Sequence, residues 1–187
     1  MSQPALQSAL QRAEHVFTKR PEAAQMHKVS TATVRAGTRC EFAEDEWRYI
    51  SDMPEALGGS ATGPTPGTLI RAGLVTCLAI GYSVRAAYLG IPVRHIAVEL
   101  HTDADLRGLF CGQAEVPVYS SIRYAVSIDS DASDADIERL IEEGDANSPY
   151  LNLFRTAQTV RREVTLRRTA PAELGSSAGL ASMAEPA

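Results

Sequence analysis

Cys77 is the residue of this sequence with the clearest capacity for chemistry, because a cysteine thiolate is both a nucleophile and a redox centre. It lies about eleven residues inside a predicted helix, beyond the first turn in which the helix dipole could favour a thiolate. A reactive Cys77 therefore needs a cation from elsewhere, and the candidates on the predicted N-terminal strands are Arg35, Arg39 and Arg48. A cysteine in an apolar helix can equally be inert core packing, so both interpretations stay open at this point.

Two other patterns carry weaker signals. His95, Glu99 and His101 share one face of a predicted strand and could in principle hold a metal, but no further ligand cluster accompanies them and an exposed polar face explains them better. Gly58 to Gly63 has the G-x-x-x-x-G spacing of a phosphate loop, but Pro-Thr follows it rather than Lys-Ser or Lys-Thr. We expect no metal and no cofactor.

Composition narrows the class of protein. The chain has 187 residues, 44% of them hydrophobic, which fits one domain with a real core. A net charge of -5 argues against nucleic acid as a partner. The three cysteines are odd in number and widely spaced, which is typical of reduced thiols in a cytoplasm. We expect no signal peptide, and no membrane span, since the apolar stretch Ala72 to Val84 is too short.

A long helix is predicted to position Cys77. A loop rich in Gly and Pro covers Met53 to Gly67, and within it Thr65 can cap the helix while Pro66 suits its first turn. The helix then extends from Thr68 to Leu89 and stops at Gly90-Ile91-Pro92. Its many small side chains allow another backbone to approach closely, so we expect it inside the globule or at a subunit interface.

The remaining elements give an α+β plan. A first helix precedes three short strands that form an antiparallel meander, and the long helix is followed by a hairpin of two alternating strands. A capped helix, one helical turn, a last strand and a tail that we expect to be disordered complete the chain. In chain order these elements are residues 5–19, 29–35, 38–43 and 47–50, then 94–102 and 118–128, then 133–144, 150–154, 157–167 and 169–187.

The loop and helix before Cys77 match a family pattern. The segment DMPEALGGSATGPTPGTLIRAGLVTC reads acidic-x-Pro, then Gly-Gly-x-x-x-Gly-Pro-x-Pro, then a helix with cysteine on its third turn. This pattern resembles the OsmC family, which includes the organic hydroperoxide reductases. The resemblance extends from about Val29 to Val164, and it includes Gly90-Ile91-Pro92, Ile96 to Leu100, Asp105-Leu106-Arg107-Gly108, Ser121 to Ile128 and the helix from Ser133.

The resemblance implies a fold and an assembly. It predicts an OsmC-like α+β fold in which antiparallel sheets pack around long central helices of an intertwined homodimer. It also places the thiol pocket between subunits, so an N-terminal arginine of one chain would serve Cys77 of the other. We expect one OsmC-like domain over residues 1–168, with residues 1–27 as a helical extension and 169–187 as the tail.

The resemblance also implies a reaction. In the family's peroxidases a cysteine at the position of Cys77 attacks the peroxide and becomes a sulfenic acid, and a second cysteine then closes a disulfide. Here Ser148-Pro149 occupies the place of that second motif, Cys-Pro-Val, and Gly67 replaces a glutamate ten residues before the cysteine. Arg39 is the arginine that we expect to stabilise the thiolate, and Cys111 could serve as an alternative resolving cysteine.

Two functions follow as hypotheses. The first is thiol-dependent reduction of organic hydroperoxides by one reactive cysteine, Cys77, with Arg39 as its cation and an external thiol as reductant. Its partners would be a second copy of the chain and a small organic hydroperoxide. The alternative is a non-catalytic OsmC-like protein that binds a small apolar ligand in the same pocket, which the changes at Ser148 and Gly67 favour.

Overall fold

A computed structural model describes residues 3–113 and 115–166 of the chain. The chain divides into two units, residues 1–157 and residues 158–187, and every helix and strand described below belongs to the first. The described part of the second unit, residues 158–166, has no regular secondary structure, so the strand predicted over 157–167 is wrong for the residues described. A strand forms only where its backbone groups find a pairing partner, which a local sequence pattern does not specify. The predicted tail at 169–187 lies outside the described residues.

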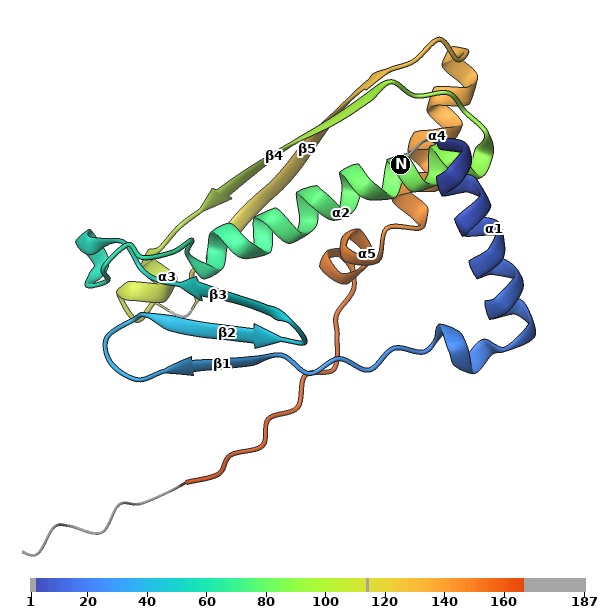
Figure 1. The fold of residues 1–187 in the computed structure, drawn as a ribbon. Helices are drawn as coiled ribbons and strands as arrows, with labels where there is room; N and C mark the ends of the chain where they lie inside the picture. Colours follow the sequence, from blue (N-terminus) through green and yellow to red (C-terminus); the bar gives the residue numbers. More distant parts are fainter. Residues whose placement is uncertain (1–2, 114, 167–187) are drawn as a thin grey trace, which may run out of the picture. The chain divides into compact units, whose positions relative to one another are not determined.

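The long helix α2, Pro66–Leu89, is the central element of the first unit (Figure 1). Its boundaries follow the predicted signals: the Thr65 hydroxyl accepts a hydrogen bond of 3.1 Å from the backbone N–H of Thr68, and Pro66 occupies the first turn. Gly90 ends the helix with a φ of 70°, the left-handed conformation that a glycine adopts without strain. Helices α1 (Gln3–Lys19), α4 (Asp134–Ala146) and α5 (Pro149–Arg155) all contact α2.

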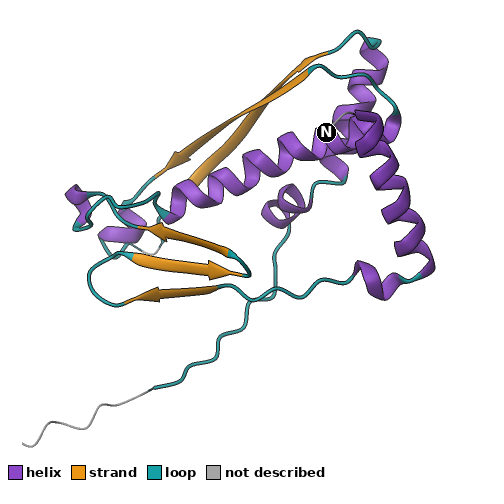
Figure 2. Cartoon of the chain, viewed as in Figure 1, coloured by secondary structure: helices purple, strands orange, loops and turns teal. Residues whose placement is uncertain are grey.

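A two-stranded hairpin covers one side of α2. Strands β4 (His95–Ala104) and β5 (Tyr119–Asp129) pair antiparallel, and α3 (Arg107–Phe110) lies in the connection between them (Figure 2). As the alternating pattern predicted, the apolar side chains of β4 face the helix. They pack with the buried side chains of α2 and α5 in one core cluster, whose members are Leu74, Leu78, Tyr82, Leu151, Ile96, Val98, Leu100, Tyr124, Val126 and Ile141. A second cluster is built around Ala86, Ile91 and Leu140.

The N-terminal strands form the predicted meander. Strands β1 (Thr31–Val34), β2 (Cys40–Glu44) and β3 (Trp47–Ser51) pair antiparallel in sequence order. Gly37 and Asp45, with φ of 62° and 47°, lie in the two turns. Most of the meander's side chains are exposed within one chain, including Trp47 at 69% and Val34 at 55%, so this sheet leaves much apolar surface uncovered.

The buried carboxylate of Asp52 organises the loop between β3 and α2, which also contains a short 3-10 helix at Glu55–Leu57. It accepts hydrogen bonds from the hydroxyls of Thr38 (2.7 Å) and Thr62 (2.9 Å), and from the backbone N–H groups of Met53, Ser60 and Thr62. The Thr38 hydroxyl contributes most to holding the pKa of Asp52 well below its usual range, and the two groups of Thr62 follow. The loop is therefore fixed around one negative charge.

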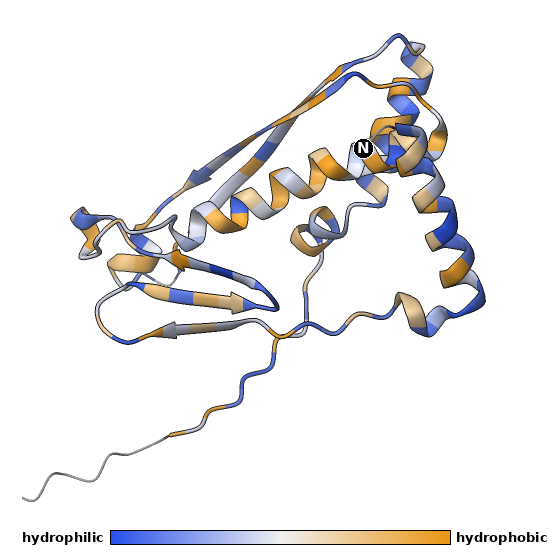
Figure 3. Cartoon of the chain, viewed as in Figure 1, coloured by the Kyte–Doolittle hydropathy of each residue, from blue (hydrophilic) through white to orange (hydrophobic). Residues whose placement is uncertain are grey.

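Helix α2 is long and apolar enough to cross a bilayer, judged by length and composition alone. Figure 3 shows apolar residues along most of α2, whereas polar residues are frequent on α1. The same helix is the one that the hairpin, α1, α4 and α5 contact, so its apolar character also serves the packing of the first unit.

Candidate functional site at Cys77

One face of α2 packs in the core and another lines a groove. Leu74, Leu78 and Tyr82 are at most 2% exposed and point into the core under the hairpin. The residues on another face recur at positions i, i+3, i+4, i+7, i+8 and i+11, and they line an open groove. These residues are Gly73, Thr76, Cys77, Ile80, Gly81 and Val84. Cys77 therefore lies partly buried at a groove wall rather than in the closed core.

The groove has a volume of about 600 Å³ and a mainly apolar lining. The start of α5 forms part of its wall through Pro149 and Tyr150, and a Cβ added at Gly73 would lie 3.6 Å from the Tyr150 ring. Tyr150 thus lines the groove close to the cysteine. Ile80 is 64% exposed along the same groove, which leaves room for an apolar molecule or a second protein surface.

Ser148 lies directly beside the cysteine. Its Oγ is 3.8 Å from Cys77 Sγ, although 71 residues separate the two in the sequence. Ser148 is only 3% exposed and caps α5, since its hydroxyl oxygen accepts a hydrogen bond from the backbone N–H of Leu151 at 3.3 Å. The structure thus brings a serine hydroxyl to the position where the resemblance places a resolving cysteine.

The partly buried carboxylate of Asp145 joins the corner between α4 and α5 to the core. Asp145 accepts hydrogen bonds of 2.5 Å from the hydroxyls of Tyr82 and of Tyr124, one on each carboxylate oxygen. Its backbone carbonyl also accepts a hydrogen bond from the N–H of Ser148. Burial first, and the bond to Asp145 second, raise the pKa of both tyrosines, which therefore stay neutral donors at neutral pH. The network fixes the backbone that carries Ser148.

The expected cation is not beside the cysteine within one chain. Among the described residues no basic side chain forms an ion pair or a hydrogen bond with Cys77. Arg39 lies just before β2, about half exposed, and pairs with Glu41 at 2.6 Å. Arg48 donates to the carbonyls of Asp45 and Trp47. A pairing of Arg39 with Cys77 therefore remains a prediction that concerns a second copy of the chain.

Arg85 is the basic residue at the groove itself. It lies two helical turns after Cys77, about 12 Å along the axis, and forms an ion pair of 3.5 Å with Glu143. Its guanidinium also lies 5.2 Å from the centre of the Tyr88 ring. Sequence reasoning did not single out Arg85, although its spacing of eight residues from Cys77 places both on one helix face.

Gly67 occupies the position where the resemblance places a glutamate. A Cβ added there would lie 3.2 Å from Arg71 Nη1 and 3.5 Å from the Tyr119 hydroxyl. A carboxylate on this residue would therefore meet Arg71, which instead donates to the Thr68 hydroxyl at 3.4 Å. Arg71 and the Tyr119 hydroxyl therefore lie near residue 67 in this chain, but residue 67 itself has no carboxylate.

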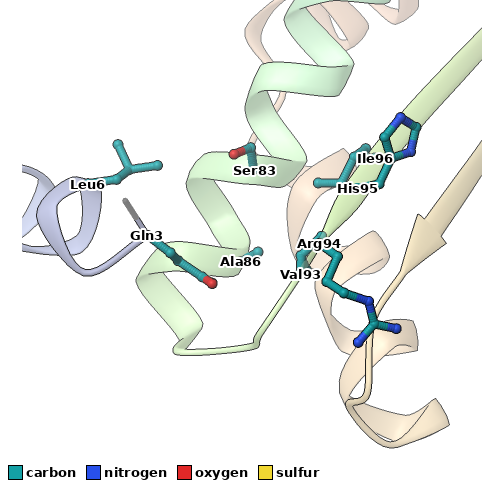
Figure 4. Close-up of a pocket in the computed structure, with 8 residues that line it drawn as sticks. All are labelled: Gln3, Leu6, Ser83, Ala86, Val93, Arg94, His95 and Ile96. Atoms are coloured by element: carbon teal, nitrogen blue, oxygen red, sulfur yellow. The ribbon is translucent and has the colours of Figure 1, made fainter. Parts of the chain in front are cut away.

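Another pocket, of about 300 Å³, lies away from Cys77, where α1 meets α2 and the start of β4 (Figure 4). Gln3 and Leu6 line it from α1, and the Gln3 amide donates to the carbonyl of Ile91. The charge of Arg94 there is already bound by Asp129 and Asp131. Among the described residues that line this pocket there is no cysteine, and the lining arginine forms ion pairs with two aspartates.

No metal centre is formed by the part of the chain that the structure describes, because no three His, Cys, Asp or Glu side chains are grouped to hold one. His101 instead lies 3.2 Å from Glu99 on the exposed face of β4. The chemistry available at Cys77 is therefore that of a thiol with a hydroxyl neighbour in an apolar groove.

Comparisons with known proteins show the family and the fold of the chain. The model of the OsmC-like protein family matches residues 58–163, which include α2, the hairpin, Ser148 and α5. No curated protein matches the sequence significantly. Similar solved structures include an OsmC-like protein from Mycoplasma pneumoniae, with a TM-score of 0.59 and 16% identity over 70% of this chain and 89% of that one.

Two further similar structures carry functional names. The organic hydroperoxide resistance protein OsmC from Legionella pneumophila has a TM-score of 0.52 and 17% identity, over 70% of this chain and 90% of that one. An organic hydroperoxide resistance protein from Elizabethkingia anophelis has a TM-score of 0.51 and 18% identity, over 70% and 89%. At such identities the similarity establishes a common fold, and the expected α+β architecture is confirmed.

Proposed function

This chain belongs to the OsmC-like protein family, and from that premise we propose that it reduces organic hydroperoxides with Cys77 as its single redox-active sulfur. One observation carries the proposal: Cys77 lines an apolar groove that is open to solvent, with its sulfur 3.8 Å from the Ser148 hydroxyl. A nucleophilic sulfur in an apolar, accessible groove suits a peroxide with a carbon substituent better than hydrogen peroxide.

The proposed cycle has three steps. The Cys77 thiolate attacks one peroxide oxygen, so that an S–O bond forms, the O–O bond breaks, and the alkoxide leaves and takes a proton to become an alcohol. The sulfur, oxidised by two electrons, is then a sulfenic acid. An external thiol forms a mixed disulfide with it and releases water, and a second thiol frees Cys77 as the reductant's disulfide leaves. Ser148 cannot form a disulfide, so the external thiol is required.

The proposed active form is a homodimer in a reducing cytoplasm. The exposed apolar residues of the groove face, such as Ile80, and of the meander, such as Trp47, are surfaces that a second copy would cover. In that assembly Arg39 of one chain serves Cys77 of the other. The charges of a single chain support this arrangement. Among the described residues that line the groove, Arg85 is the basic one, and it is already paired with Glu143.

The activity is tested with purified protein, cumene hydroperoxide and an excess of dithiol. Wild type is expected to consume the peroxide in proportion to protein concentration, and Cys77→Ser to abolish consumption. Cys111→Ser tests whether Cys111 acts as the alternative resolving cysteine. The rate is expected to stay unchanged, because Cys111 is exposed and does not line the groove that contains Cys77. Equal turnover by wild type and Cys77→Ser would remove the proposal.

The shared site is tested by mixing subunits. Cys77→Ser and Arg39→Ala are each expected to be inactive alone. Equal mixing after unfolding and refolding gives about half heterodimers, each with one of its two sites complete, and so about one quarter of wild-type activity. An arginine that acts within its own chain would give no recovery.

A second function is favoured by the size and lining of the groove, together with the finding that no basic side chain among the described residues pairs with Cys77. In this alternative the protein binds a small apolar molecule without catalysis. A fatty acid or an aromatic hydrocarbon would then bind with equal affinity to wild type and Cys77→Ser, and neither protein would consume peroxide. Calorimetric titration beside the peroxide assay separates the two functions.

A further inference from the structure

Ser148 is a buried N-cap residue whose side chain, backbone N–H and carbonyl are all hydrogen-bonded. Its side chain is 3% exposed and its hydroxyl oxygen accepts from Leu151 at 3.3 Å. Its backbone N–H donates to the carbonyl of Asp145 at 3.2 Å, and its own carbonyl accepts from the N–H of Asn152 at 3.0 Å. Three backbone partners therefore fix the position of the hydroxyl relative to α2.

The hydroxyl hydrogen has one partner within reach. The Leu151 N–H is a donor, so it occupies a lone pair of the Ser148 oxygen and cannot receive the hydroxyl hydrogen. The other polar atom beside the hydroxyl is Cys77 Sγ at 3.8 Å, a distance suited to a hydrogen bond to sulfur.

We infer that Ser148 is a positioning residue of the Cys77 site: its hydroxyl donates a hydrogen bond to the sulfur, first as thiolate and then as sulfenic acid. A hydrogen bond to a charged acceptor is among the stronger ones, so it favours the nucleophilic form of the sulfur. The same hydroxyl cannot close a disulfide, so the oxidised sulfur keeps a hydrogen-bond partner until an external thiol arrives. The inference rests on the proposed function for the peroxide step, but it has a readout that needs no peroxide.

Substitutions at Ser148 separate its two hydrogen bonds. Ser148→Asp keeps an oxygen acceptor for the Leu151 N–H, and Asp caps helices well, but an ionised carboxylate has no hydrogen to donate to the sulfur. Ser148→Ala loses both bonds, whereas Ser148→Thr keeps both. Ser133→Ala is the matched control, because Ser133 caps α4 in the same way, accepting from the Asp136 N–H, without touching Cys77.

The readout is the rate at which iodoacetamide alkylates Cys77 at neutral pH, followed by mass spectrometry of the peptide that carries it. We expect Ser148→Asp and Ser148→Ala to slow alkylation by about tenfold or more, the loss expected for one hydrogen bond to a charged group. Ser148→Thr is expected to stay near the wild-type rate, and Ser133→Ala to leave the rate unchanged. Should Ser148→Ala fail to fold, Ser148→Gly carries the test, because it also lacks the hydroxyl, is tolerated at a helix N-cap and, unlike Asp, adds no negative charge beside the sulfur.

The outcomes distinguish the two claims. Alkylation of Ser148→Asp as fast as wild type overturns the hydrogen-bond role of Ser148, whatever happens with peroxide. If wild type consumes no cumene hydroperoxide while alkylation still depends on Ser148, the proposed function fails and the inference stands. A wild type that consumes peroxide, together with slow oxidation and slow alkylation of the neutral Ser148→Ala variant, supports both.

Discussion

A single methyl group added at Gly144 should strongly perturb the core packing beneath the Cys77 site. It lies in α4 against Tyr82, whose ring is 1% exposed in the core of α2. A Cβ at residue 144 would lie 2.4 Å and 2.7 Å from two carbons of that ring. Carbon atoms in contact stay about 3.5 to 4.0 Å apart, so the ring would have to retreat by about 1 Å.

The expected cost follows from what the ring contacts. Overpacking a core costs about 1–3 kcal/mol. The retreat also disturbs the hydrogen bond from the Tyr82 hydroxyl to Asp145, and bonds to charged groups contribute about 1.5–3 kcal/mol. The better helix propensity of alanine returns about 1 kcal/mol. Gly144→Ala should therefore lower the free energy of unfolding by about 2–4 kcal/mol.

Urea unfolding monitored by circular dichroism measures this loss. Glu142→Ala, an exposed substitution on the same helix, is the control and should change the free energy by about 0.5 kcal/mol or less. In a Tyr82→Phe background, which lacks the hydroxyl, the cost of Gly144→Ala should shrink because the hydrogen-bond part is already lost. A Gly144→Ala protein as stable as wild type would refute the packing described here.

Three further predictions concern charge and redox chemistry. The hydrogen bonds that lower the pKa of Asp52 stabilise the fold fully above about pH 4, the usual pKa of an unfolded carboxyl, and this stabilisation is lost as the pH falls further. Asp52→Asn should therefore lower stability at neutral pH and make the midpoint of urea unfolding depend less on acid pH. The raised pKa of Tyr82 stabilises the fold below about pH 10 and is lost as the pH rises further, so Tyr82→Phe should reduce alkaline destabilisation in the same measurement. Ser148→Cys should form a disulfide with Cys77 after one equivalent of cumene hydroperoxide, seen as a loss of two thiols; persistence of both would contradict the observed proximity.

Local signals predicted most of the fold. The cap at Thr65 and the stop at Gly90 located α2 to within two residues, and the alternation of Ile96 and its neighbours identified β4 and its core face. The strand expected over 157–167 is absent from its described residues, because strand formation depends on a pairing partner that no local pattern specifies.

The site was harder to predict from the sequence than the fold. Cys77 and Ser148 are far apart in the chain, and only the family pattern indicated that they belong together. The link from Tyr82 to Asp145 and Tyr124 was missed, although a tyrosine on an apolar helix stripe signals a buried hydroxyl that needs a partner. Arg39 stays a prediction because its proposed target lies on another chain.

The central claim is that the Cys77 sulfur reacts as a nucleophile with organic peroxides. Its most direct test is mass spectrometry of the protein after one equivalent of cumene hydroperoxide, with a sulfenic-acid-trapping dione present and no thiol. The account predicts a single dione adduct on the peptide that contains Cys77, and none at that peptide in Cys77→Ser. An unmodified Cys77 peptide with the peroxide intact would contradict it.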